Sequence, residues 1–227
     1  MTMKIKRLAF VVLLAGLSAR SEAALSYEWS GEQEIRDNDP SGVAFSFNLS
    51  DAATRIENVT VSLSVSGGWN GDLYAYLSSA SGFAVLLNRV GVDEGNTLGY
   101  GDGGLDVSLT SGDANPDIHT YLTSPHTYNQ SGQLTGTWQA DGRFLDPLSG
   151  TRENTLDVFD GTDPNGEWTL FFADRSGGEV STLTGFSVEF GTVPEPGSLA
   201  LLLVGSMALL ARRRRNWNKR EQANILL

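Results

Sequence analysis

The 227-residue sequence contains no cysteine, so neither a disulfide bond nor a thiolate zinc site can hold its fold together. Lysine is also missing from residues 25–190, where 24 Asp and Glu side chains stand against six Arg, a net charge of −18. Such an acidic surface repels phosphate backbones, which argues against nucleic acid as a partner. It suits an exported soluble protein, or one that gathers divalent cations.

The sequence also lacks the pattern of a long amphipathic helix. No stretch of residues 25–190 keeps its apolar residues at helical spacing over three turns. Instead, apolar and polar residues alternate, as in half-buried strands, and Gly-rich turns separate the segments. The alternating segments are 43–49, 59–65, 72–77, 105–110, 167–174 and 183–190. This pattern predicts an all-β fold, an antiparallel β-sandwich or jelly roll, in a single domain over residues 25–190.

The N-terminus has the composition of a targeting segment. Lys4, Lys6 and Arg7 precede the apolar run 8–17, and small residues follow it. This order predicts a secretory signal peptide over residues 1–24, which signal peptidase cleaves after Ala23 or the next residue. The alternative is a buried N-terminal helix.

The C-terminus combines an extended motif, a short apolar run and a basic cluster over residues 191–215. As a helix, the run 198–211 spans about 21 Å, less than the roughly 30 Å of the hydrocarbon core. It predicts a single short transmembrane helix whose basic side, with the tail 216–227, is cytoplasmic. The residues that define the signal are Pro194, Glu195, Pro196, Arg212, Arg213, Arg214 and Arg215.

The stretch "VPEPGSLALL" followed by four arginines resembles the PEP-CTERM sorting signal of Gram-negative bacteria. The resemblance implies that an exosortase cleaves near Pro-Glu-Pro, so that the protein meets the membrane transiently and ends in the envelope or outside the cell. It also implies a biofilm and exopolysaccharide setting. The tail is longer than usual in that family, and a permanent membrane anchor is the alternative.

A second resemblance covers most of residues 40–190. The stretches 58–87, 134–144 and 159–190 are similar to the P domain, or P/homo B domain, of proprotein convertases and related bacterial proteases. The last stretch is the most specific, with "DGTDPNGEW" before a strand and "LTGFSV" after a Gly turn. The resemblance implies a jelly-roll sandwich that usually accompanies a subtilisin-like protease.

Calcium is the most plausible ligand for the acidic loops, because it binds carboxylate, amide and carbonyl oxygens. The P-domain resemblance implies calcium near Asp72 and Asp106, with Asp102 in the same Gly-rich loop as Asp106. Hydrogen bonding of these carboxylates to turn amides is the alternative. The stretch "DNDPSG" (37–42) opens like a calcium loop, but Asn48 occupies the twelfth position, so an Asx-turn before a strand is favoured.

Aromatic side chains suggest a second kind of ligand site. Trp69, Tyr74, Tyr76 and Tyr100 are candidates for stacking on a sugar ring, with packing under loops as the alternative. Packing is favoured for the three tyrosines, whereas Trp69, in a Gly-rich loop, is the stronger candidate.

The sequence offers no recognisable catalytic constellation. His119 and His126 are interpreted as surface loop residues, and no Gly-x-Ser-x-Gly elbow is present. The leading hypothesis is an exported, non-catalytic envelope or matrix protein with a structural or adhesive role in an exopolysaccharide, and calcium is its candidate stabilising ion. One alternative is an accessory P domain that acts with a separate subtilisin-like protease chain, and another is a hydrolase without a recognisable motif.

Overall fold

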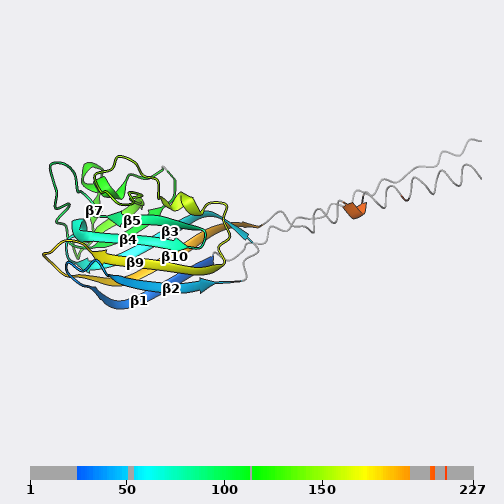
Figure 1. The fold of residues 1–227 in the computed structure, drawn as a ribbon, viewed down its shortest axis with the longest axis horizontal. Helices are drawn as coiled ribbons and strands as arrows, with labels where there is room; N and C mark the ends of the chain where they lie inside the picture. The colour runs from blue at the N-terminus through cyan, green and yellow to red at the C-terminus, as the bar shows by residue number, and fades with distance from the viewer. Residues whose placement is uncertain (1–24, 51–53, 113, 195–204, 208–212, 214–227) are drawn as a thin grey trace, which may run out of the picture.

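The computed structural model describes residues 25–50, 54–112, 114–194, 205–207 and 213 (Figure 1). Its strands are β1 (Leu25–Ile35), β2 (Val43–Leu49), β3 (Thr54–Gly67), β4 (Leu73–Ser79), β5 (Gly82–Asn88), β6 (Leu105–Thr110), β7 (Thr127–Tyr128), β8 (Leu134–Gln139), β9 (Gly166–Asp174) and β10 (Ser181–Pro194). Three short 3-10 helices connect them: η1 (Asn70–Asp72), η2 (Ile118–Thr123) and η3 (Leu156–Phe159). The prediction of a mostly β protein is confirmed.

The strands form two sheets that enclose one core. The sheet orders are β1-β10-β3-β6-β8-β7 and β2-β9-β4-β5. Alternation explains the layers, since Val61 and Leu63 of β3 and Leu170 and Phe172 of β9 are all buried on inner faces. Trp168 of β9 joins the layers, because its ring packs 4.7 Å from that of Phe190 in β10.

One pairing departs from the predicted antiparallel arrangement. β6 and β8 run parallel, with Leu105 opposite Leu134 and Thr110 opposite Gln139. A parallel pair requires a crossover of a dozen residues or more, and residues 111–133, which include η2 and β7, supply it. The expectation of a wholly antiparallel sandwich is therefore wrong at this point.

Three connections between the sheets lie together at one end of the molecule, on the left in Figure 1. They are the β1–β2 turn (36–42), the β3–β4 connection (68–72) and the β9–β10 turn (175–180), and we call this end the far loop end. β10 starts there and runs for 14 residues, about 45 Å, to the opposite end.

β10 continues beyond Phe190, the last residue of the predicted domain, and ends at Pro194, which pairs with Thr54 of β3. The first proline of the Pro-Glu-Pro motif is thus part of the sheet. No linker separates the folded body from the start of the sorting signal.

Most of the two terminal segments lies outside the described residues, including the predicted signal peptide with Ala23 and the tail 216–227. Of the sorting residues, Pro194 and Arg213 are described, and Arg213 is exposed. Residues 205–207, inside the predicted span, are helical. Within the described part of the chain, no helix is long and apolar enough to cross a membrane.

Candidate functional site

The three aspartates predicted to bind metal lie in different surroundings. Asp72 is buried in η1, and Asp106 is exposed on the outer face of β6. The carboxylate of Asp102 accepts a 2.7 Å hydrogen bond from the Tyr121 hydroxyl. The structure does not bring the three together, and no group of three or more Asp, Glu or His in the described residues is arranged to hold a metal ion.

The turn "DNDPSG" behaves as the Asx-turn that the sequence favours. The amide of Ser41 donates to Oδ1 of Asp39 at 3.0 Å, and β2 begins two residues later. Asp37 has a different role, since its Oδ1 accepts a 2.9 Å hydrogen bond from the amide of Gly178. This bond ties the β1–β2 turn to the β9–β10 turn.

A pair of buried carboxylates lies at the far loop end, where the register of β4 and β9 sets Leu73 opposite Asp174. Asp72 precedes Leu73, and Asp72 and Asp174 are 1% and 0% exposed. One oxygen of each, Oδ2, is buried without a hydrogen-bond partner, and so is the hydroxyl of Ser181. Burial first, and then the negative charge of Asp174, raise the pKa of Asp72. Burial likewise raises the pKa of Asp174.

Trp69, the predicted sugar-binding residue, lies beside this pair. Its carbonyl accepts a 3.0 Å hydrogen bond from the amide of Asp72, and its side chain is 38% exposed. The ring rests against Gly178, where any larger residue would collide with it. Trp69 therefore covers the β9–β10 turn with one face and leaves part of its ring in solvent.

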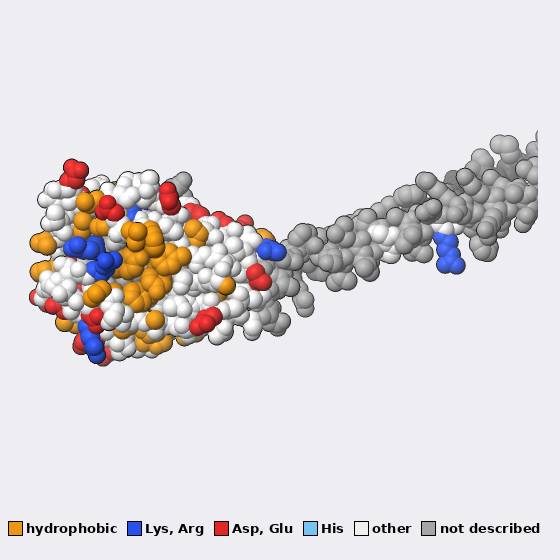
Figure 2. Space-filling view, in the orientation of Figure 1, with side chains coloured by type: hydrophobic (Ala, Val, Ile, Leu, Met, Phe, Trp, Pro, Cys, Tyr) orange, Lys and Arg blue, Asp and Glu red, His pale blue; other side chains and the backbone are white. Residues whose placement is uncertain are grey.

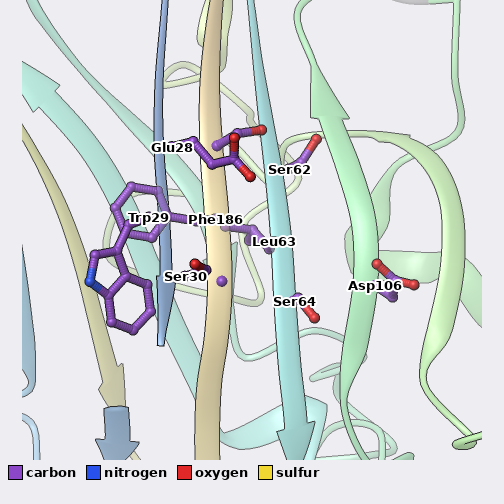
Figure 3. Close-up of a pocket in the computed structure, with 10 residues that line it drawn as sticks. Glu28, Trp29, Ser30, Ser62, Leu63, Ser64, Asp106 and Phe186 are labelled. Atoms are coloured by element: carbon purple, nitrogen blue, oxygen red, sulfur yellow. The ribbon is translucent and has the colours of Figure 1, made fainter. Parts of the chain in front are cut away.

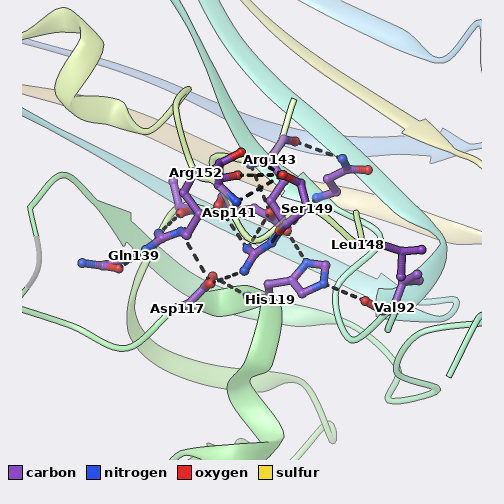
Figure 4. A network of polar contacts seen from close by, with 12 residues as sticks. Val92, Asp117, His119, Gln139, Asp141, Arg143, Leu148, Ser149 and Arg152 are labelled. Atoms are coloured by element: carbon purple, nitrogen blue, oxygen red, sulfur yellow. Dashed lines mark hydrogen bonds and ion pairs between the residues drawn. The ribbon is translucent and has the colours of Figure 1, made fainter. Parts of the chain in front are cut away.

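The second buried charged group surrounds His119 (Figure 4), and the expectation of a surface histidine is wrong here. His119 is 4% exposed, with Nδ1 2.7 Å from Oδ2 of Asp141 and Nε2 3.0 Å from the carbonyl of Val92. Arg143 pairs with Asp141 at 3.1 Å and with Asp117 at 2.9 Å. Burial lowers the pKa of His119, but the hydrogen bond and charge of Asp141 outweigh this effect and raise it overall.

This network stabilises the fold and leaves His119 no free ring nitrogen. The backbone amide of Asn88 also donates to Asp141, at 3.1 Å, so the carboxylate joins β5 to the segment after β8. A catalytic base needs an unshared nitrogen facing a substrate. His119 is therefore a structural residue.

The outer face of the four-stranded sheet is aromatic, and Figure 2 shows hydrophobic side chains gathered over β4, β5 and β9. The rings of Tyr76 and Phe171 stack 4.8 Å apart at an interplanar angle of 17°. Phe83 lies 4.7 Å from Tyr76, and Phe144 meets Phe83 edge-on at 5.3 Å. We call these four residues the aromatic face.

Tyr74 borders the aromatic face and is 8% exposed beneath the guanidinium of Arg175, which lies 5.4 Å from its ring centre. The prediction that the tyrosines pack is confirmed for Tyr74 and for Tyr100, which packs edge-on against the buried ring of Tyr121 at 4.7 Å. Tyr76 packs as well, between Phe83 and Phe171, and it remains partly exposed. Phe83, Phe144 and Phe171 were not predicted, although Phe171 occupies an outward position in the alternation of β9.

A shallow pocket of about 220 Å³ adjoins the aromatic face. Phe144 and Leu145 form its apolar side, and both are exposed, by 46% and 76%. Carboxylates and hydroxyls line the remainder, among them Asp146, Ser149 and Glu153. Flat rings and hydrogen-bonding groups thus lie next to each other on one surface.

The outer face of the six-stranded sheet is hydroxylated instead, with a pocket of about 220 Å³ over β1, β10, β3 and β6 (Figure 3). Asp106 lies on this face. Its serines bond within the sheet, because Ser62 is 3.0 Å from Ser108 and Thr184 donates to Ser64 at 2.9 Å. These groups are already satisfied, so this face is the weaker candidate for a ligand.

Comparison with solved structures gives distant similarities. A serine protease of Aeromonas sobria in complex with the chaperone ORF2 shares 14% identity at a TM-score of 0.39, with 75% of this chain and 27% of that chain covered. The protease of Aeromonas sobria by itself shares 14% sequence identity at a TM-score of 0.36, and the match covers 73% of this chain and 27% of the protease chain. The infectious bursal disease virus VP2 subviral particle shares 13% sequence identity at a TM-score of 0.22, and the match covers 90% of this chain and 54% of the VP2 chain. The chain spans only about a quarter of the length of the protease chains.

No curated protein matches the chain. Residues 192–215 match the family model of the PEP-CTERM protein-sorting motif, and the match begins within the last residues of β10. The C-terminus therefore carries a PEP-CTERM sorting motif, which indicates an exported protein that an exosortase processes for the cell envelope or the extracellular space.

Proposed function

We propose that this chain is a non-catalytic matrix protein that binds neutral polysaccharide through its aromatic face after export and exosortase processing. The observation that carries the proposal is the position of the sorting motif. The motif begins within the last residues of β10, so the two-sheet body is the part that processing would deliver outside the cell. Signal peptidase and exosortase are the processing partners, and the membrane contact is transient.

The aromatic face supports a sugar ligand. Pyranose rings present C–H surfaces edged by hydroxyl groups, and the face offers the Phe144 ring, which is 46% exposed, beside the partly exposed stacked pair of Tyr76 and Phe171. The adjoining pocket adds the carboxylates of Asp146 and Glu153, which can accept hydrogen bonds from sugar hydroxyls. An exposed apolar patch of this kind marks an interaction site on a soluble protein.

Charge selects among polysaccharides. Residues 25–190 carry 24 acidic side chains against six arginines, so the body repels uronate-rich or phosphorylated polymers. Arg175, which borders the aromatic face, already lies over Tyr74. A neutral glycan pays no electrostatic penalty at this surface.

A non-catalytic role is consistent with the histidines. His119 engages both ring nitrogens inside the fold, and Nδ1 of His126 is 2.8 Å from the carbonyl of Ser124. The activated Ser–His pair of a serine hydrolase requires a histidine nitrogen directed at the nucleophile. The binding surface, by contrast, needs no reacting group.

Intact-mass measurement of the protein recovered from cells and from medium tests the processing step. We expect a mature chain that lacks the N-terminal segment up to Ala23 or the next residue and that ends near Pro194. A mass that includes residues 197–227 in all fractions would overturn exosortase processing. Replacement of Glu195 by Ala, with Glu189→Ala in β10 as the matched control, should block processing only in the first variant.

Retention on neutral and acidic polysaccharide gels tests the binding step. We expect the native protein to be retained by a neutral glycan, and Tyr76→Ala and Phe144→Ala to weaken retention about tenfold, which corresponds to roughly 1.4 kcal/mol. Ser62→Ala, on the outer face of the opposite sheet, is the matched control and should bind like the native protein. Equal retention of all variants would remove the aromatic face from the proposal.

A further inference from the structure

The far loop end contains two buried carboxylates that have no ion-pair partner in the described part of the chain. Asp72 and Asp174 are almost wholly buried, and each keeps one carboxylate oxygen without a hydrogen-bond partner. Buried charges are normally paired or coordinate a metal. Neither carboxylate forms an ion pair within the described residues, and their mutual repulsion is offset only in part, by a hydrogen bond between Ser176 and Asp72 and by the more distant charge of Arg89.

The nearby cation, Arg89, does not fill this role. Its Nε donates to the carbonyl of Gly71 at 3.3 Å, and its Nη2 donates to the carbonyl of Thr97, also at 3.3 Å. The guanidinium therefore serves backbone oxygens and influences the two carboxylates only from a distance. Asp37, the other charged neighbour, is acidic and adds to the negative field.

We infer that Asp72 and Asp174 hold a calcium ion that clamps the far loop end. Their two free oxygens are hard ligands of the kind that calcium prefers. The third buried oxygen without a partner, the hydroxyl of Ser181, belongs to the same end and lies against Gly68, four residues before Asp72. Calcium also accepts backbone carbonyls and water, so these side chains need not complete its coordination alone.

The surrounding backbone is already arranged to hold the carboxylates in place. The amides of Asn38 and Ser176 donate to Oδ1 of Asp174, at 3.3 and 3.1 Å, and so leave Oδ2 free. The carbonyl of Asp72 accepts a 2.8 Å hydrogen bond from the amide of Arg175. One oxygen of Asp174 is thus fixed by the turns, while its partner oxygen remains available for a cation.

Such a clamp would join all three connections of the far loop end. Asp72 belongs to the β3–β4 connection, Asp174 and Ser181 flank the β9–β10 turn, and Asn38 links the β1–β2 turn to Asp174. The end lies about 45 Å along β10 from Pro194, where the Pro-Glu-Pro sequence begins. Extracellular calcium modules commonly bind in the submillimolar to millimolar range, so the site would fill once the protein is exported.

Thermal unfolding of the full-length chain in mild detergent, in excess EGTA and in saturating calcium, tests this site. We expect calcium to raise Tm by about 5–10 °C, the shift for a ligand well above its Kd in a chain of this size. Isothermal titration calorimetry should give one calcium per chain. An unchanged Tm together with no heat of binding would overturn the inference.

Variants assign the ligands. Asp174→Asn should abolish the calcium-dependent shift while its Tm in EGTA stays equal to or above that of the native protein. Asp106→Asn, an exposed aspartate on β6, is the matched control and should keep the full shift. Ser181→Ala removes only a hydroxyl and should reduce the shift, which provides a second test if Asp174→Asn folds poorly. A full shift in both Asp174→Asn and Ser181→Ala would place the calcium elsewhere and refute the assignment.

Discussion

Two groups of buried acids divide this molecule, and they differ in what balances their charge. Around Asp141, the chain supplies its own cations, because Arg143 and His119 both lie within 3.1 Å of the carboxylate. Around Asp72 and Asp174, the described chain supplies none within ion-pair distance, and two carboxylate oxygens remain without partners. The first group is paired within the protein, whereas the second is the one for which we infer a cation from solution.

The difference between the two groups shows that burial alone does not identify a ligand site. Both groups are nearly inaccessible to solvent, so exposure alone does not separate a structural network from a ligand site. Hydrogen bonding does, since every oxygen of Asp141 has a partner and Oδ2 of Asp174 has none. Removal of a carboxylate should therefore have opposite effects in the two places.

The largest expected effect is at Asp141. Asp141→Ala would leave Arg143 and His119 buried with one partner fewer, and we expect a loss of about 3–5 kcal/mol in the free energy of unfolding. Urea denaturation in EGTA measures this loss as a lower midpoint at constant m-value. Glu153→Ala, an exposed acid nearby, should change stability by less than about 0.5 kcal/mol. A similarly small effect at Asp141 would show that the network is not a stabilising unit.

Local pattern was sufficient to predict much of the fold. Strict alternation in β3 and β9 identified their buried faces. The parallel β6–β8 pair was missed, because strand neighbours depend on the path of the connection 111–133 and not on the composition of either strand.

The candidate sites also depend on contacts between distant segments, which the local sequence pattern does not predict. Calcium near Asp72 was expected from the P-domain resemblance, but Asp174 meets Asp72 only through the register of β4 and β9, across about a hundred residues of sequence. His119 looked like a loop residue because its partner Asp141 comes from a different segment. Contacts between distant segments are invisible to periodicity, which reports only which way a side chain points within its own strand.

The second effect is smaller and has the opposite sign. In EGTA near neutral pH, Asp72→Asn should raise the free energy of unfolding by about 2 kcal/mol, because it removes a buried charge that repels Asp174 and has a carboxylate oxygen without a partner. The same urea titration measures it, with Asp106→Asn as the exposed control. Destabilisation on the scale expected for Asp141→Ala would mean that Asp72 has a partner in the protein, and the contrast between the two groups would disappear.

The smallest expected effect is the pH dependence of the contribution that His119 makes to stability. The folded protein raises the pKa of His119 above its unfolded value of about 6.5, so this histidine stabilises the fold fully below that pH and loses its contribution as pH rises through the folded pKa. His119→Gln should therefore cost about 1 kcal/mol at mildly acidic pH and progressively less in alkaline solution.

The raised pKa values of Asp72 and Asp174 also favour the apo fold as pH falls, but they act equally in both proteins. The difference in unfolding free energy between native protein and His119→Gln, measured in EGTA across this pH range, isolates the histidine. A difference that does not change with pH would mean that His119 is held as a neutral ring. Its contacts with Asp141 and Val92 would then be ordinary hydrogen bonds, and Arg143 would be the only cation that balances the buried carboxylate.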